Sequence, residues 1–183
     1  MESEAIIYAV RRWVEDFVVG LNLCPFAGRE LIRNRVRFVV TEAATEERLL
    51  VALATELALL DDDMTIETTL LIHHNVLQDF SDYNQFLDTA ELFLAQTKLE
   101  GVYQIASFHP DYQFAGTGVN DAENFTNRSP YPLLHILREA SLERSIAAHP
   151  DVEQIPVRNI EIMNSLGRER IQSLIQDRTD GSR

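Results

Sequence analysis

Cysteine is almost absent from this 183-residue chain, since Cys24 is the single one, and no apolar run approaches the roughly 20 residues that cross a bilayer. One cysteine cannot form an internal disulfide, which agrees with a reducing compartment. The first residues also lack the basic segment, apolar core and cleavage site of a secretory signal. We therefore expect a cytoplasmic protein.

Positive charge is scarce as well. Sixteen lysines and arginines face 29 aspartates and glutamates, which gives a formal net charge of -13. This excess repels phosphate backbones and anionic membrane surfaces, so we expect neither nucleic acid nor membrane as a partner. Screening confines each charge to about 10 Å at 0.1 M salt, so a local cationic pocket for a small anionic or polar ligand is still compatible with the composition.

The sequence has no internal repeat, no low-complexity tract and no interdomain linker. With 45% hydrophobic residues, it is long enough to bury a sizeable core. We expect a single globular domain over residues 1–176, followed by a frayed tail over 177–183.

Hydrophobic spacing predicts the main elements. Apolar residues at three- and four-residue steps indicate helices over 4–20, 46–60 and 82–98, and strand patterns occur at 35–40, 65–74 and 102–108. The first strand alternates apolar residues with arginines, which is typical of an edge strand with one solvent-facing side. The second is apolar on both sides and is expected at the sheet centre.

Strands that alternate with helices favour crossover connections between parallel strands. The sequence therefore predicts an α/β fold with a small, mostly parallel sheet of three or slightly more strands, layered with helices. The alternative is an α+β fold with a mixed sheet, because three strands do not determine the strand order. Further helices are expected from near Pro130 or Pro132, from Pro156, and over 168–177.

The stretch "SFHPDYQFAGTGVNDAENFTNRSPYP", residues 107–132, has no apolar periodicity. A long irregular loop in a compact domain is usually functional or disordered, and this composition favours function. If the strands are parallel, the loop and the pair His73-His74 leave the sheet at a common edge, where α/β folds bind ligands. Alternatively, His109-Pro110 is only a turn, and the aromatic residues of the loop merely cover the sheet edge.

Three residues are candidates for catalysis. Histidine titrates near neutral pH, so His109 could act as a general acid or base, and His135 could face the same pocket. Cys24 could serve as a nucleophile if a histidine lies within reach. The alternative for Cys24 is that of an inert, buried thiol.

Five residues are candidates for ligand binding. Tyr112, Asn124 and Arg128 come from the long loop, with Arg128 beside the start of the expected helix, where an anion is favoured. Arg138 would share a helix face with His135, three residues away. Arg158 either completes the site or, with neighbouring asparagines, caps helix ends.

No metal site is expected, because no second pair of ligands follows at metal-binding spacing. The sequence assigns no cofactor.

Four segments occur in order along the chain: "LNLCPF", "SFHPDYQFAG", "NRSPYPLLHILRE" and "IPVRNIEIMNSLG". With them, the chain resembles an uncharacterised bacterial family known as domain of unknown function number fourteen-fifteen, from the first helix to about residue 170. The resemblance implies a bacterial cytosolic protein and supplies no activity, cofactor or catalytic residue.

Two kinds of function fit these observations. The first is an enzyme, a hydrolase or group transferase, that acts on a small polar or anionic metabolite through a pocket of histidine and arginine side chains. The second is a non-catalytic module that binds a small anion or a partner protein.

Overall fold

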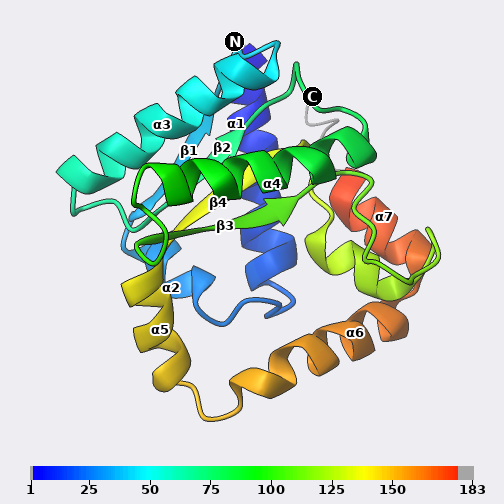
Figure 1. The fold of residues 1–183 in the computed structure, drawn as a ribbon. Helices are drawn as coiled ribbons and strands as arrows, with labels where there is room; N and C mark the ends of the chain where they lie inside the picture. Colours follow the sequence, from blue (N-terminus) through cyan, green and yellow to red (C-terminus); the bar gives the residue numbers. More distant parts are fainter. Residues whose placement is uncertain (1, 177–183) are drawn as a thin grey trace.

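The structure is a computed structural model that describes residues 2–176. The expected tail at 177–183 lies outside the described residues. In chain order the elements are α1 (Glu2–Trp13), η1 (Val14–Val19), α2 (Ala27–Ile32), β1 (Val36–Val40), α3 (Glu46–Asp62), β2 (Thr68–Ile72), α4 (Phe80–Gln96), β3 (Tyr103–Phe108), η2 (Ala122–Asn127), β4 (Leu133–Arg138), α5 (Glu139–Ala147), η3 (Val152–Gln154), α6 (Ile155–Leu166) and α7 (Arg168–Gln176). Figure 1 shows α3 and α4 in front of the sheet and α1 behind it.

The four strands form one sheet in the order β1-β2-β4-β3. Strands β1 and β2 are parallel, and β4 is antiparallel to both β2 and β3. The sheet is therefore mixed, which confirms the α+β alternative and corrects the expectation of a mostly parallel sheet of three strands. Because β4 is antiparallel to both neighbours, β1, β2 and β3 still run in the same direction.

The fourth strand lies where the sequence predicts a helix from near Pro130 or Pro132. Leu134 and Ile136 point to one side of the sheet and Leu133 to the other, where all three are fully buried. A strand covered on both sides carries apolar residues at consecutive positions, and a short run of this kind cannot be told from a buried helix by spacing alone. The helix of this region, α5, begins only at Glu139.

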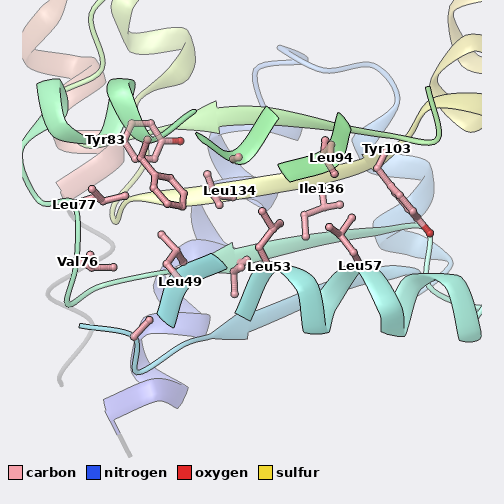
Figure 2. Packing of buried hydrophobic residues seen from close by; sticks show 14 of the residues in the cluster. Leu49, Leu53, Leu57, Val76, Leu77, Tyr83, Leu94, Tyr103, Leu134 and Ile136 are labelled. Atoms are coloured by element: carbon pink, nitrogen blue, oxygen red, sulfur yellow. The ribbon is translucent and has the colours of Figure 1, made fainter. Parts of the chain in front are cut away.

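One side of the sheet, which we call the α3/α4 face, is covered by the two longest helices. Thr45 caps α3 by accepting a hydrogen bond from the backbone N–H of Arg48, and Asp79 caps α4 in the same way. Leucines spaced four residues apart on α3 face the sheet: Leu49, Leu53 and Leu57. Figure 2 shows these side chains directed toward Leu134 and Ile136 of β4.

The position of β1 at the sheet edge and of β2 in its interior agrees with the sequence analysis. The side of β1 that was expected to face solvent is partly covered by α3, and 34% of the Arg37 side chain remains exposed. Arg37 makes two hydrogen bonds to the carboxylate of Glu56 on α3, at 2.7 and 3.1 Å, and only 5% of Glu56 is exposed. An arginine can therefore point into a helix layer when its charge is paired there.

The other side of the sheet, which we call the α1 face, is covered by shorter elements. Trp13 at the end of α1 and Phe17 of η1 pack there with Leu70 and Ile72 of β2. Single side chains from η2, α6 and α7 complete the cluster: Phe125, Met163 and Ile171. This face thus draws on segments from both ends of the described chain.

Within residues 2–176, no helix combines the length and the apolar character that crossing a membrane requires.

Candidate functional site

The second and third strands end at the same edge of the sheet, as expected. Ile72 of β2 and Phe108 of β3 both pair with Leu133, the first residue of β4. His73 and His109 therefore lie on either side of that residue. Both imidazoles are fully buried on the α3/α4 face, where the ring of Tyr83 lies 5.7 Å from His73 and 5.1 Å from His109.

His109 has both ring nitrogens engaged. Its Nδ1 accepts a hydrogen bond from the backbone N–H of Asp111 at 3.0 Å, so Nε2 carries the proton and donates to the carbonyl of Leu77 at 3.2 Å. Burial lowers the pKa of His109 and favours this neutral form. In this position the imidazole joins the long loop to the turn before α4.

Arg128 holds the loop from inside. Its Nε donates to the carbonyl of Tyr112 at 3.2 Å and its Nη2 donates to the carbonyl of Val119 at 2.8 Å. The guanidinium also lies over the ring of Phe125, 4.4 Å from the ring centre. Burial lowers the pKa of Arg128.

Asn124 is the second internal anchor of the loop. Its side-chain oxygen accepts hydrogen bonds from the Phe114 N–H and the Thr117 hydroxyl, and its nitrogen donates to the carbonyl of Gly118. Gly116 adopts a φ of +81°, a conformation that favours glycine. The loop therefore has a defined shape that its own polar side chains maintain.

Tyr112 and Arg158 also contact the protein itself. The ring of Tyr112 packs against Phe80 and Phe114, with centroids 5.1 and 4.9 Å away. Arg158 of α6 donates from Nη2 to the carbonyl of Asn22 at 2.9 Å. This bond holds the turn that precedes Cys24.

Arg138 lies in β4 and not on the expected helix, so it does not share a face with His135. Its guanidinium donates to the carbonyls of Leu60, Asp63 and Ile66, where α3 ends and the chain turns toward β2. A cation that binds the last carbonyls of a helix stabilises the helix end.

Cys24 and His135 line the same cavity. It lies on the α1 face and has a volume of about 530 Å³. Alternate strand positions supply its floor, including Val36, Thr68, Leu70, Ala106, Phe108 and His135. Side chains from α1, η1, α2, α5 and the turn at Cys24 supply its walls, including Trp13, Val18, Phe26, Leu31, Leu142 and Ala148. His109 and Arg128 are not among its lining residues.

The hydrogen bond between His135 and Thr68 determines which ring nitrogen of His135 can act as an acceptor. The hydroxyl of Thr68 donates to the carbonyl of Ile136 at 2.6 Å, so toward His135 it can only accept. The His135 Nε2, 2.8 Å away, therefore carries the proton and donates it to Thr68. Burial lowers the pKa of His135 to about 4, so the ring is neutral near pH 7 and its Nδ1 keeps a free lone pair.

The cavity is locally rich in positive charge, although the chain is strongly acidic. Four arginines and two glutamates line it. Arg35 forms ion pairs with Glu30 and Glu67, and Arg29 pairs with Glu30. Arg144 of α5 donates to the hydroxyl of Ser141 at 2.7 Å and has no carboxylate partner in the part of the chain that the structure describes.

Cys24 and His135 are candidates from the sequence, whereas Trp13, Thr68 and Arg144 are lining residues that the sequence does not point to as a site. Thr68 and Trp13 each had a signal. Thr68 shares the strand alternation of Leu70, and Trp13 lies in the apolar stripe of the first helix. Arg144 had none, because a charged residue on an exposed helix is ordinary.

A comparison with known protein families identifies the family of this chain. The family DUF1415, a protein of unknown function, matches residues 5–173. The chain belongs to the DUF1415 family. No curated protein and no solved structure matches it. The family match covers both the long loop and the whole cavity lining of this DUF1415 protein.

A smaller hollow of about 290 Å³ lies between η2, α6 and α7 of the DUF1415 chain, lined by residues that include Asp121, Asn164 and Arg168. Among residues 2–176, no group of three or more histidine, cysteine, aspartate or glutamate side chains is placed to hold a metal ion. The cavity on the α1 face has the greater volume of the two and combines apolar residues with a thiol, an imidazole and arginines. It is therefore the candidate functional site.

Proposed function

We propose that this DUF1415 protein binds a small amphipathic anion, with an apolar body and an acidic head group, in the cavity on the α1 face. The observation that carries the proposal is a cavity with an apolar floor and an excess of arginine in an otherwise acidic chain. Its volume of about 530 Å³ lies within the range of roughly 300–1,000 Å³ that small-molecule sites occupy. The sequence predicts a pocket of histidine and arginine side chains; the pocket proposed here keeps His135 from that prediction and adds Arg144.

Arg144 is the proposed contact of the acidic group. The other lining arginines are engaged: Arg29 and Arg35 pair with glutamates, and Arg138 donates to backbone carbonyls. A guanidinium without a carboxylate partner is free to form a charge-assisted hydrogen bond to a ligand. Arg144 belongs to α5, so a ligand bound to it would lie between this helix and the sheet.

A pair of fluorescent probes tests this assignment. Anilinonaphthalene sulfonate has an aromatic body and an anionic group, whereas N-phenylnaphthylamine has a similar body without the charge. We expect both probes to bind, and Arg144→Gln to weaken only the sulfonate, by about two- to five-fold as for an exposed ion pair. The matched control is Arg33→Gln, because Arg33 is an exposed arginine that does not line the cavity.

A second variant locates the probes. Ala106 lies on the cavity floor beside His135 in the strand register, so Ala106→Leu should reduce binding of both probes. The proposed function is wrong if neither probe binds the wild type. It is also wrong if both probes bind Ala106→Leu as tightly as they bind the wild type.

Catalysis is the second candidate, because a thiol and a histidine line the same cavity. Cys24 would attack an electrophilic substrate, and His135 would take its proton. The low pKa of His135 counts against this, since an effective general base titrates near the working pH. The test is the rate of Cys24 alkylation by iodoacetamide against pH, in the wild type and in His135→Leu. A fast reaction near neutral pH that needs His135 would support catalysis. An alkylation rate that does not depend on His135 would argue against catalysis and favour the proposal of a binding protein.

A further inference from the structure

The identity of the polar groups inside the cavity narrows the class of ligand. We infer that the ligand carries a hydroxyl group on its apolar body, which donates a hydrogen bond to His135 Nδ1 and accepts one from the indole N–H of Trp13. This inference rests on the proposed function and names the ligand class of the same site, an apolar hydroxy acid.

The first argument is the fixed tautomer of His135. Thr68 gives its single proton to the carbonyl of Ile136 and accepts from His135 Nε2, so the imidazole presents only an acceptor on its other side. No described residue donates to that Nδ1. A carboxylate, which has no proton to give, would be repelled there, whereas a hydroxyl would be bound.

The second argument is the side chain of Trp13. Only 1% of Trp13 is exposed, and its Nε1–H has no hydrogen-bond acceptor among residues 2–176. Buried donors in native proteins almost always have a partner, and a donor that lacks one needs an explanation. Because Trp13 lines the cavity, a ligand oxygen is the partner we infer.

The third argument is the relative position of the two groups. The Trp13 ring packs edge-on against Phe108 with a centroid distance of 5.4 Å, and the Phe108 ring lies 6.2 Å from that of His135. The two rings that carry the donor and the acceptor therefore both pack against Phe108, which lines the cavity. A hydroxyl is the simplest group that serves both, since it donates one hydrogen bond and accepts others.

A series of straight-chain carboxylates tests the inference, each compared with its ω-hydroxy counterpart of equal length. Affinities follow from displacement of anilinonaphthalene sulfonate, confirmed by calorimetry. At the length that spans from Arg144 to His135, we expect the hydroxy acid to bind about ten-fold more tightly or better, because the plain acid leaves both polar groups unpaired.

Two variants test whether the preference for the hydroxy acid depends on the imidazole of His135 and its tautomer. Replacement His135→Leu should reduce the preference for the hydroxy acid while plain carboxylates still bind, because only the Trp13 N–H then remains to bind the hydroxyl. Replacement Thr68→Val should reduce it, because the imidazole is then free to place its proton on Nδ1. Nitrogen-detected NMR of the wild type gives a readout that requires no variant to fold: Nδ1 should be unprotonated, and its resonance should move only when a hydroxylated ligand binds.

The outcomes separate this inference from the proposed function. Equal affinities at every chain length, a preference as large in His135→Leu as in the wild type, or a protonated Nδ1 would overturn the inference and leave a pocket for amphipathic anions. If neither the carboxylates nor the sulfonate probe bind, the proposed function itself fails.

Discussion

On the α3/α4 face, two helices of 17 residues each pack directly on the sheet, and their buried leucines join the apolar strand residues in one cluster. On the α1 face, α1 and η1 cover part of the same sheet, while α2 and α5 stand around a cavity of about 530 Å³. Neither α2 nor α5 has a fully buried residue. Both faces of the sheet therefore bury an apolar cluster, but only the α1 face also has a cavity of this size beside its cluster.

The histidines show the same contrast. On the α3/α4 face, His109 is bonded at both ring nitrogens, whereas His73 donates from Nδ1 to the carbonyl of Val76 and its buried Nε2 has no partner among residues 2–176. On the α1 face, His135 is bonded only through Nε2. The same residue type thus belongs to the core on one side of the sheet and to a candidate binding site on the other.

The largest expected effect comes from removing a leucine on the α3/α4 face. Leu53 is fully buried in α3, so Leu53→Ala should lower the free energy of unfolding by about 3 kcal/mol or more, because it removes apolar contact and leaves a void. The matched change on the other face is Leu142→Ala, at the cavity wall, with an expected loss below about 1 kcal/mol. Urea denaturation of both variants measures the difference. Equal losses would contradict the contrast between the two faces.

Acid should destabilise the protein through its buried histidines. Burial lowers the pKa of His73 from the usual 6.5 to about 4 in the folded protein, so the unfolded chain binds a proton that the native chain rejects. The contribution of neutral His73 to the free energy of unfolding is fully present above pH 6.5. It is lost as the pH falls toward 4, by on the order of 3 kcal/mol in total.

NMR titration of the imidazole protons checks the assignment directly. We expect the His73 signal to stay unchanged from neutral pH down to about pH 5, and urea denaturation to show the loss of stability over the same range. A His73 midpoint above pH 6 would contradict the expectation. Binding of a hydroxy acid should lower the midpoint of His135 further without changing that of His73, because only His135 faces the cavity.

Much of the fold could be predicted because local sequence and tertiary context agree. β2 is apolar on both faces and lies in the interior of the sheet, and the alternation of β1 predicted its edge position. β4 could not be predicted, because Leu133–Arg138 carries apolar residues that fit either a buried strand or a helix. Without β4, the remaining strands and helices alternate, and this order predicts a mostly parallel sheet.

The candidate site could be predicted only in part, since the same residue types serve loops and ligands. Asn124 and Arg128 look like binding residues in the sequence, yet both form hydrogen bonds that shape their own loop. The chemistry of Cys24 and His135 makes them candidates, but their common cavity depends on how α2 and α5 are placed relative to the sheet. No periodicity in the sequence specifies that arrangement.

Enlarging an alanine should affect the two faces differently. Ala90 of α4 is fully buried in the α3/α4 core, so Ala90→Leu should cost about 1–3 kcal/mol through overpacking. Ala106 lies at the cavity floor, where Ala106→Leu has space and should change stability by less than about 0.5 kcal/mol. Thermal or urea denaturation distinguishes the two variants. An equally large loss at Ala106 would show that the cavity floor does not tolerate added volume.

The smallest expected effect concerns one hydroxyl on the α3/α4 face. The Tyr83 hydroxyl donates to the carbonyl of Leu133 at 2.8 Å and accepts from the N–H of Phe108 at 3.0 Å, so it joins α4 to the edge where β3 ends and β4 begins. Replacement Tyr83→Phe leaves both backbone groups unpaired in a buried place and should cost about 1–2 kcal/mol. The matched control is Tyr8→Phe, since 55% of Tyr8 is exposed and its loss should be within about 0.5 kcal/mol. Because Tyr83 lies on the face opposite the cavity, probe affinity should stay the same in both variants, and a weaker probe affinity in Tyr83→Phe would show that the two faces are energetically coupled.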